Sequence, residues 1–592
     1  MSRWVAAGLC SGVIVILSVA LPGLSFGQVL RSKTLLAASP GSAAQIESPP
    51  AKAQGPGSQG ESSGFTVDRY LVEGNTLLPE EKIDSLLAKH RRTGMTIKDL
   101  EQAKNDLEKA YREAGYPTVL VTIPEQTIES GSVRLLVVEG RVGAIAVTGN
   151  RYFEKFRILE KLPSLKHGEV LYEPAFMKEL DLLNAHPDRK VAPVLKPGEE
   201  SGLLNVELKV KDRLPVHGKI EGDNKGPITT PRNRLVTELQ HANLFGGDEI
   251  FTVSTIQTPT DWGAVQNYSA SFVLPVIWPD HLLSFYASKA ISKSVLAGGA
   301  VSIGGGDVSI AGNATIAGFR YLMPISKSVS GTHSLSFGVD YKRLEKTEAT
   351  FPGSLGTATV LSPIQYTPVS VGYAGTFSDS SGVSRLFSTA KGYVAGMIPG
   401  GTKSDFTGDP NDPNNPGQGR VGSTGTFAVL QGGIERIQPL PMDFSLFLHI
   451  DGQWGSQPLV PAEQYFAGGM DTVRGYDNYE AVGDNAVRGR AELTTPELIQ
   501  IPFDRFWQRK KSADWVLGLR VAAFYDAANL WVQQAQPGQT SQFRLEGAGL
   551  GIRAKFPKDL GELKVDQAWA LRETSVTRQG DTFVNFSVNL TF

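Results

Sequence analysis

The feature that most constrains this chain is an alternation of apolar and polar residues with a period of two. From about residue 216 to the C-terminus, sixteen strand-like segments follow one another, separated by turn-rich stretches. Successive side chains of a strand point to opposite faces, so such a segment has one apolar and one polar face. In the last segment, apolar residues alternate with polar ones. The apolar residues are Val584, Phe586, Val588, Leu590 and Phe592, and the polar residues between them are Asn585, Ser587 and Asn589. An even number of such strands predicts a membrane β-barrel of sixteen antiparallel strands with a polar lumen.

Other ways of crossing a membrane are excluded by hydropathy. Only one apolar run reaches 18 residues, and it lies at the extreme N-terminus. Hydrophobic residues make up 41% of the chain, which is too many for a disordered protein and too few for a helical membrane protein. Within a bilayer only helices and closed barrels satisfy every backbone polar group, which leaves the barrel. The alternative is a soluble β-sandwich or a series of immunoglobulin-like domains, with apolar faces turned inward and tighter turns.

The N-terminus reads as an export signal. Residues 1–27 place Arg3 before a long apolar stretch, which is followed by small residues at Ser25 and Gly27. The alternative is a retained membrane anchor. Cys10 is the only cysteine, so we expect the exported chain to have no disulfide and no thiol metal site. The formal net charge of −2 makes nucleic acid a poor candidate partner.

Between the signal and the barrel we expect a linker and two small domains. Residues 28–64 are rich in Ala, Pro, Gly and Ser and predict a flexible linker. Residues 65–141 have the order strand, helix, helix, strand, strand, and residues 142–213 repeat it. The string Val72-Glu73-Gly74-Asn75 recurs as Val147-Thr148-Gly149-Asn150, which indicates two tandem α/β modules. The second helix of the first module is predicted to begin at Thr96, with Asp99 completing an N-cap pattern.

No catalytic constellation is present in the sequence. The eight histidines show no metal-ligand spacing, and there is no nucleophile elbow or phosphate-binding loop. The string Gly246-Gly247-Asp248-Glu249-Ile250 superficially resembles a cyclic-dinucleotide synthase signature, but it falls in a turn between strands. We therefore expect no enzyme activity, no cofactor and no metal.

The informative polar residues lie in and before two late strands. Glu492 and Asp526 fall on strand faces opposite apolar residues, so we expect both carboxylates to point into the lumen. A long loop precedes these strands, and its tip reads Val473-Arg474-Gly475-Tyr476. An arginine there could pair in bidentate fashion with a lumen carboxylate and hold the loop inside the barrel. The alternative is an exposed loop with a solvated arginine.

Several motifs resemble those of one transporter family. The loop 473–476, the string Glu492-Leu493-Thr494-Thr495-Pro496 and the strand residues Phe524-Tyr525-Asp526 look like the diagnostic motifs of two-partner secretion transporters. These form the haemolysin secretion/activation family within the superfamily of outer-membrane protein insertases. Residues 115–142 resemble its first polypeptide-transport-associated (POTRA) domain, and residues 184–226 resemble its second POTRA domain running into the first barrel strand.

The resemblance implies a function. Two periplasmic POTRA domains would capture an unfolded exoprotein, and a 16-stranded barrel in the outer membrane of a Gram-negative bacterium would conduct it outward. The sixth loop would fold into the pore, with Arg474 as its arginine, Asp526 as the wall partner and Glu492 nearby. Expected partners are the exoprotein, outer-membrane lipid and the barrel-assembly machinery, for which we predict Phe592 to be the signal. Only residues 28–39 precede the Pro-rich stretch, which is short for the plug helix that family members often carry.

Two rival functions stay open at this stage. A barrel-assembly factor of the same superfamily usually carries more POTRA repeats than the two found here. A diffusion porin would need neither the POTRA pair nor the loop 473–476. The cargo is an adhesin, a cytolysin or a contact-dependent toxin, and the sequence does not distinguish these or say whether passage activates it.

Overall fold

The computed structural model describes residues 65–592 with internal gaps at 129–130, 201, 277–280, 297–307, 329–330, 351–356, 362, 398–400, 410–416, 418–419, 421 and 503–515. The expected signal peptide (1–27) and linker (28–64) lie outside the described residues. The described chain forms two compact units, one up to Pro215 and one from Val216 to Phe592. None of its described helices is long and apolar enough to cross a bilayer.

The first unit begins with an α/β module whose helices cover one face of a three-stranded sheet. Its elements are β1 (Arg69–Glu73), α3 (Glu80–Ala88), α4 (Ile97–Glu113), β2 (Val119–Thr122) and β3 (Ser132–Glu139). The sheet order is β1-β3-β2, with β1 parallel and β2 antiparallel to β3. As expected, α4 begins with a capping box, in which the Thr96 hydroxyl accepts from the Asp99 amide and the Asp99 carboxylate accepts from the Thr96 amide.

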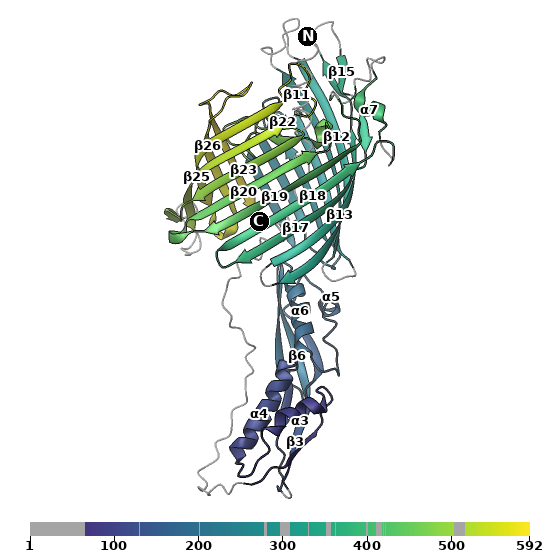
Figure 1. Ribbon diagram of the computed structural model, residues 1–592, viewed down its shortest axis with the longest axis vertical. Coiled ribbons are helices and arrows are strands. Elements are labelled where there is room, and N and C mark those ends of the chain that lie inside the picture. The colour runs from purple at the N-terminus through teal and green to yellow at the C-terminus, as the bar shows by residue number, and fades with distance from the viewer. Residues whose placement is uncertain are drawn as a thin grey trace. The chain divides into compact units, whose positions relative to one another are not determined.

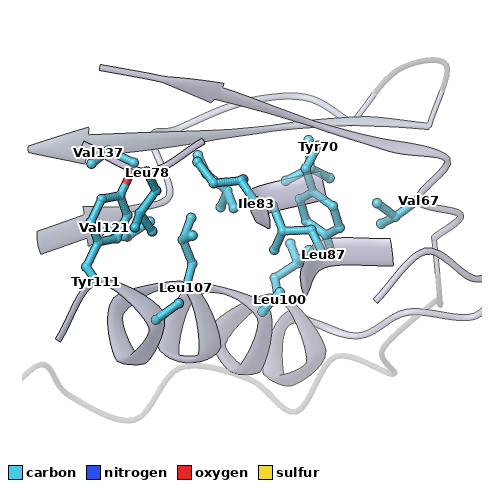
Figure 2. Close-up of a cluster of buried hydrophobic side chains, with 14 of the residues drawn as sticks. Val67, Tyr70, Leu78, Ile83, Leu87, Leu100, Leu107, Tyr111, Val121 and Val137 are labelled. Atoms are coloured by element: carbon cyan, nitrogen blue, oxygen red, sulfur yellow. The ribbon is translucent and has the colours of Figure 1, made fainter. Parts of the chain in front are cut away.

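A single apolar core holds this module together. Side chains from α3 and α4 point at the inner face of the sheet and fill the space between the layers (Figure 2). Leu87, Leu107, Tyr111 and Val121 are fully buried there. Burial of such side chains contributes roughly 1.5–3 kcal/mol each relative to exposure, so the helices are stabilised mainly by packing.

The second module repeats the same order and topology. Its elements are β4 (Arg141–Thr148), α5 (Lys155–Glu160), α6 (Glu173–Asn184), β5 (Arg189–Pro197) and β6 (Leu203–Asp212). The sheet order is β4-β6-β5, again with one parallel and one antiparallel pairing. The two modules contact each other, because the Glu173 amide donates to the Gly115 carbonyl at 2.9 Å and the rings of Tyr116 and Tyr172 lie 5.4 Å apart.

The repeated Gly-Asn string has one structural cause in both modules. Gly74 and Gly149 have φ of +85° and +81°, and a Cβ on either would collide with a strand carbonyl oxygen, that of Val137 or Val210. The following asparagines cap the turn, since Asn75 Nδ2 donates to a carbonyl three residues on at 2.8 Å and Asn150 Nδ2 does so at 2.9 Å. The Gly-Asn string thus does the same work in both copies, because the glycine allows a positive φ without a Cβ and the asparagine caps the turn.

The second unit is a closed antiparallel barrel of sixteen spanning strands (Figure 1). They are β7 (Val216–Asp223), β8 (Arg234–His241), β9 (Ile250–Gln257), β10 (Val265–Pro275), β11 (Leu282–Leu296), β12 (Val308–Ser328), β13 (Gly331–Leu344), β17 (Val369–Asp379), β18 (Gly382–Tyr393), β19 (Phe427–Pro439), β20 (Ser445–Gly455), β23 (Asn485–Thr494), β25 (Val516–Trp531), β26 (Gln542–Lys555), β27 (Gly561–Ala570) and β28 (Thr582–Thr591). Each of the sixteen segments predicted from the sequence lies in one of these strands, which confirms the predicted fold class.

Shorter elements extend the barrel ends. Four short strands join the barrel sheet: β14 (Thr347–Thr350), β15 (Thr357–Leu361), β16 (Ile364–Tyr366) and β24 (Ile499–Pro502). Two more, β21 (Tyr465–Ala467) and β22 (Ala481–Gly483), pair with each other in the loop between β20 and β23. The short helix α7 (Lys403–Thr407) lies between β18 and β19.

The alternation of the strands separates a lipid face from a lumen face. In β28, Val584 is 55% exposed on the outside of the barrel, whereas Asn585 and Ser587 are buried inside. In β20, Ile450 is 57% exposed, whereas His449 is buried. Apolar side chains thus point outward, which excludes the β-sandwich and gives the barrel an apolar outer surface.

The barrel closes where β28 pairs with β7. This seam has five register pairs, fewer than any other pair of neighbouring spanning strands. Phe592 lengthens it, because its amide donates to the Gly218 carbonyl at 3.0 Å and its carbonyl accepts from the Gly218 amide at 2.8 Å. The Phe592 ring is 70% exposed and lies over Gly218, where a Cβ would collide with it.

The module turn yields a stability prediction. We expect Gly149→Ala to destabilise the second module by more than Gly168→Ala. Both glycines have positive φ, but only at Gly149 would an added Cβ also collide with a neighbouring backbone atom. The control should cost about 1 kcal/mol for the left-handed backbone alone. Hydrogen–deuterium exchange of the full-length protein measures this, and equal exchange in residues 142–212 of the two variants would contradict the account.

The C-terminal residue yields a second prediction. Deleting Phe592 removes two hydrogen bonds from the shortest strand pairing, so we expect less folded barrel in the outer membrane. Phe592→Tyr keeps the backbone and an aromatic ring and serves as the matched control. The measurement is the amount of heat-modifiable barrel in outer-membrane fractions, and an unchanged amount after deletion would count against an assembly role.

Candidate functional site

The site is built by the long loop between β20 and β23, which folds into the barrel interior. The β21–β22 hairpin carries the loop inward, and Gly468 and Gly469 turn the chain with φ of +111° and +93°. The following residues Val473, Arg474 and Tyr476 are each at most 1% exposed. The tip predicted from the sequence is therefore a buried segment, and the alternative of a solvated arginine is wrong.

Arg474 makes a bidentate ion pair with Asp526 of β25. Its Nε donates to Asp526 Oδ2 at 2.6 Å and its Nη2 to Oδ1 at 2.9 Å. The Arg474 backbone amide also donates to Oδ2, at 3.1 Å. Asp526 is fully buried, so this pair lies in a region of low dielectric where its geometry must be good to repay desolvation.

The remaining nitrogen of the guanidinium contacts two more wall carboxylates. Arg474 Nη1 donates to Glu492 of β23 at 2.6 Å and to Asp566 of β27 at 3.3 Å. Arg553 of β26 bridges the same two carboxylates, at 3.0 Å to Glu492 and 2.6 Å to Asp566. With Arg490, whose Nε lies 3.4 Å from Asp526, three arginines face three carboxylates and the charges balance.

The wall provides space and an aromatic surface for the loop. The guanidinium carbon of Arg474 lies 3.4 Å from the centroid of the Phe524 ring, a cation–π contact. On β26 the inward positions include Gly547, Gly549 and Gly551, and a Cβ on Gly547 would overlap the Arg474 carbonyl oxygen. The loop backbone can therefore approach the wall at this point only because position 547 is glycine.

Tyr476 fastens the other side of the loop tip. Its hydroxyl hydrogen bonds with backbone groups of Glu546 and Arg572, with the two carbonyl oxygens at 2.9 Å. Val473 and Tyr476 belong to an apolar cluster with Leu530 and Leu545 of the wall. Gly475 has φ of +97°, and a Cβ there would come within 2.8 Å of the Trp569 backbone. All four tip residues thus contact the wall or require close approach to it.

The structure brings together Arg474, Asp526 and Glu492, the residues singled out in the sequence, and it adds Asp566, Arg553 and Phe524. The same alternation could have placed Asp566 and Arg553 on the lumen face, because they stand opposite Val565 and Ile552. Arg520, which shares a strand face with Asp526, is not part of the network. It pairs with Glu497 at 3.2 Å instead.

Beside the loop the lumen contains a cavity of about 740 Å³ with many charged lining residues. Its charged lining residues are Lys219, Glu221, Asp223, Lys225, Arg234, Glu238, Lys342, Lys391, Asp451, Glu463, Asp471 and Arg488. Both signs are equally represented among them, so the cavity suits a polypeptide of mixed charge better than a single ion type.

A closed barrel with a buried arginine loop, in a chain that also carries α/β modules, defines the class of POTRA-barrel outer-membrane proteins. The ShlB-type POTRA domain matches residues 65–140, and the haemolysin secretion/activation protein ShlB/FhaC/HecB matches residues 202–554. The second match covers more than half of the chain, which therefore belongs to the haemolysin secretion/activation family. This is a family of secretion transporters of the outer membrane, which act with secreted exoproteins.

Individual relatives are distant in sequence. The outer membrane transporter CdiB of Dickeya dadantii is 25% identical over 182 residues, which is 31% of this chain and 32% of that protein. The heme/hemopexin transporter protein HuxB of Haemophilus influenzae is 21% identical over 451 residues, 74% of this chain and 71% of that protein. The chain thus spans about a third of the first relative's length and more than two thirds of the second's.

Solved structures support the fold. CdiB from Escherichia coli superimposes with a TM-score of 0.63 at 21% identity, over 93% of this chain and 94% of that one. CdiB from Acinetobacter baumannii gives a TM-score of 0.57 at 17% identity, over 98% of this chain and 99% of that one.

The glycine wall yields a prediction about loop docking. We expect Gly547→Ala to displace the loop, because its Cβ would overlap the Arg474 backbone and not a flexible side chain. Gly489→Ala on β23 is the control, since a Cβ there meets nothing within 4 Å. A Cys10→Ser, Val473→Cys background carries a single buried reporter thiol. Maleimide should label it faster in Gly547→Ala than in Gly489→Ala, and equal rates would contradict the assignment.

Proposed function

We propose that this protein translocates an unfolded exoprotein across the outer membrane, with the POTRA modules binding the substrate and the barrel conducting it outward. The observation that carries the proposal is the loop held inside the barrel by Arg474. A diffusion porin needs no buried ion-pair network around a loop tip, and a loop in this position must move before a polypeptide can pass.

The α/β modules support a role in capture. Each sheet has three strands, so β1 and β2 are edges of the first sheet and β4 and β5 are edges of the second. An extended polypeptide can add a strand to such an edge through backbone hydrogen bonds, which do not demand one particular sequence. The periplasm has no ATP, so transport would be driven by this binding and by folding of the exoprotein outside the cell.

The charges of the Arg474 network balance, and this determines how much free energy release of the loop would cost. Removing one partner of a buried ion pair typically costs about 3–5 kcal/mol, because it leaves an uncompensated charge. A loop held this firmly does not open by itself, yet the barrel does not depend on it, because the strand ladder closes without the loop. We propose that binding of the exoprotein shifts the loop. We also propose that the protein is no enzyme. Its further partners would be lipid and the barrel-assembly machinery, both of which contact the barrel.

Secretion tests the role of Arg474. We expect Arg474→Ala to abolish secretion of a co-expressed exoprotein partner while heat-modifiability shows an assembled barrel. Arg520→Ala is the matched control, because Arg520 is on the same strand as Asp526 but pairs only with Glu497 among the described contacts. Secretion by Arg474→Ala at the wild-type level would refute the proposal.

The same strains separate secretion from barrel assembly. Deleting the gene should leave the levels of other outer-membrane proteins unchanged if the protein is a secretion transporter. A general fall in those levels would favour the assembly factor.

A further inference from the structure

A second charged cluster lies in the lumen, apart from the Arg474 network. Glu463 sits at the end of the short 3₁₀ turn η3 (Pro461–Glu463), early in the same loop, and is 4% exposed. Its Oε1 accepts from the Lys342 ammonium of β13 and from the Tyr366 hydroxyl at 2.7 Å. Its Oε2 accepts from the Lys391 ammonium of β18 at 2.8 Å.

In this cluster two wall cations share one carboxylate that belongs to the loop. β13 and β18 flank β17, so the two lysines reach Glu463 from the same part of the barrel wall. The nearest other wall carboxylate, Asp340, is held by Arg320 at 2.6 Å. All three of Lys342, Lys391 and Glu463 line the lumen cavity of about 740 Å³, so a chain in the lumen would pass beside them.

The residues next to Glu463 pack against the barrel wall with apolar side chains. Leu459 and Val460 are fully buried in a cluster with Tyr366, Tyr393 and Phe406. Phe406 comes from α7, the short helix between β18 and β19, which is labelled at one end of the barrel in Figure 1. Its ring lies 5.9 Å from that of Tyr366 and takes the space that a Cβ on Gly425 would need. We call residues 459–463 and α7 the lid.

We propose that Lys342 and Lys391 form a carboxylate-binding site, which Glu463 occupies at rest and which acidic side chains of the translocated polypeptide take over. This inference rests on the proposed function. Exchanging one carboxylate for another keeps both ammonium groups paired, so neither lysine is left as an uncompensated buried charge at any step. Once Glu463 leaves, the lid loses its charged anchor and residues 459–460 can move away from Tyr366 and Tyr393.

The site is specific for an anion carried on an extended chain. Both lysines are wall residues fixed by strand pairing, whereas the carboxylate comes from a loop. A cationic segment would instead be repelled by the lysine pair and has no carboxylate to exchange. The lid thus responds to acidic segments of the passing chain.

Reporter labelling in the full-length protein tests the site. In a Cys10→Ser, Val460→Cys background, we expect hexaglutamate to raise the maleimide labelling rate at least about tenfold, the factor for loss of one charge-assisted hydrogen bond. Hexalysine should leave the rate unchanged. The Glu463→Gln variant should be labelled fast even without peptide. The double variant Lys342→Gln, Lys391→Gln should also be labelled fast, and hexaglutamate should not change its labelling rate.

A matched control removes a lysine from the same cavity. Lys219 lines it but pairs with Glu221 at 2.7 Å, so Lys219→Gln should respond to hexaglutamate like the parent protein. An unchanged labelling rate in the parent protein, or an equal loss of response in Lys219→Gln, would overturn the proposal.

Peptide binding gives a second measurement that does not require the double lysine variant to fold. Fluorescence anisotropy with labelled hexaglutamate should show tighter binding to Glu463→Gln than to the parent, because the tethered competitor is gone. Equal affinity would overturn the proposal. Neither assay involves secretion, so failure here leaves the transport function standing, and failure of the Arg474 secretion test leaves these measurements interpretable.

Discussion

The buried guanidinium of Arg474 is the interaction on which the interior of this barrel depends. Its bonds to Asp526, Glu492 and Asp566 join the loop to three different strands, β25, β23 and β27. A charge in that position is tolerable only because every partner is present and the geometry is bidentate. The wall around it is shaped accordingly, with Phe524 under the guanidinium and glycine at Gly547 where the backbone passes.

Two of the attachments of this loop to the wall have opposite chemistry. Near its start, Glu463 is an acid held by two wall lysines beside an apolar lid. At its tip, Arg474 is a base held by wall acids. Opening the lumen would require both to release, and because they carry opposite charges, no single charged segment of a substrate competes for both. Under the proposed function, these ion pairs would hold the loop in the lumen between transport events without any energy source.

Much of the fold follows from local patterns. The period-two alternation in β28 and β20 sets which side chains meet lipid, and the repeated Gly-Asn turn marks the two modules, because both effects depend on residues close together in the chain. Arg474, Asp526 and Glu492 could be selected from their strand faces and from family motifs. Asp566 and Arg553 lay on the predicted lumen face as well, but the sequence offers many lumen-facing charges and no way to rank them.

The sequence by itself therefore determined the sixteen strands, the two α/β modules, the polarity of each strand face and the presence of a cationic loop tip. Those properties come from the stereochemistry of single residues and from periodicity. Only the tertiary structure decided which charges pair, because the partners of Arg474 lie 18 to 92 residues away and those of Glu463 lie 72 to 121 residues away. Barrel closure brings these residues together, and the register that does so is a property of the whole sheet.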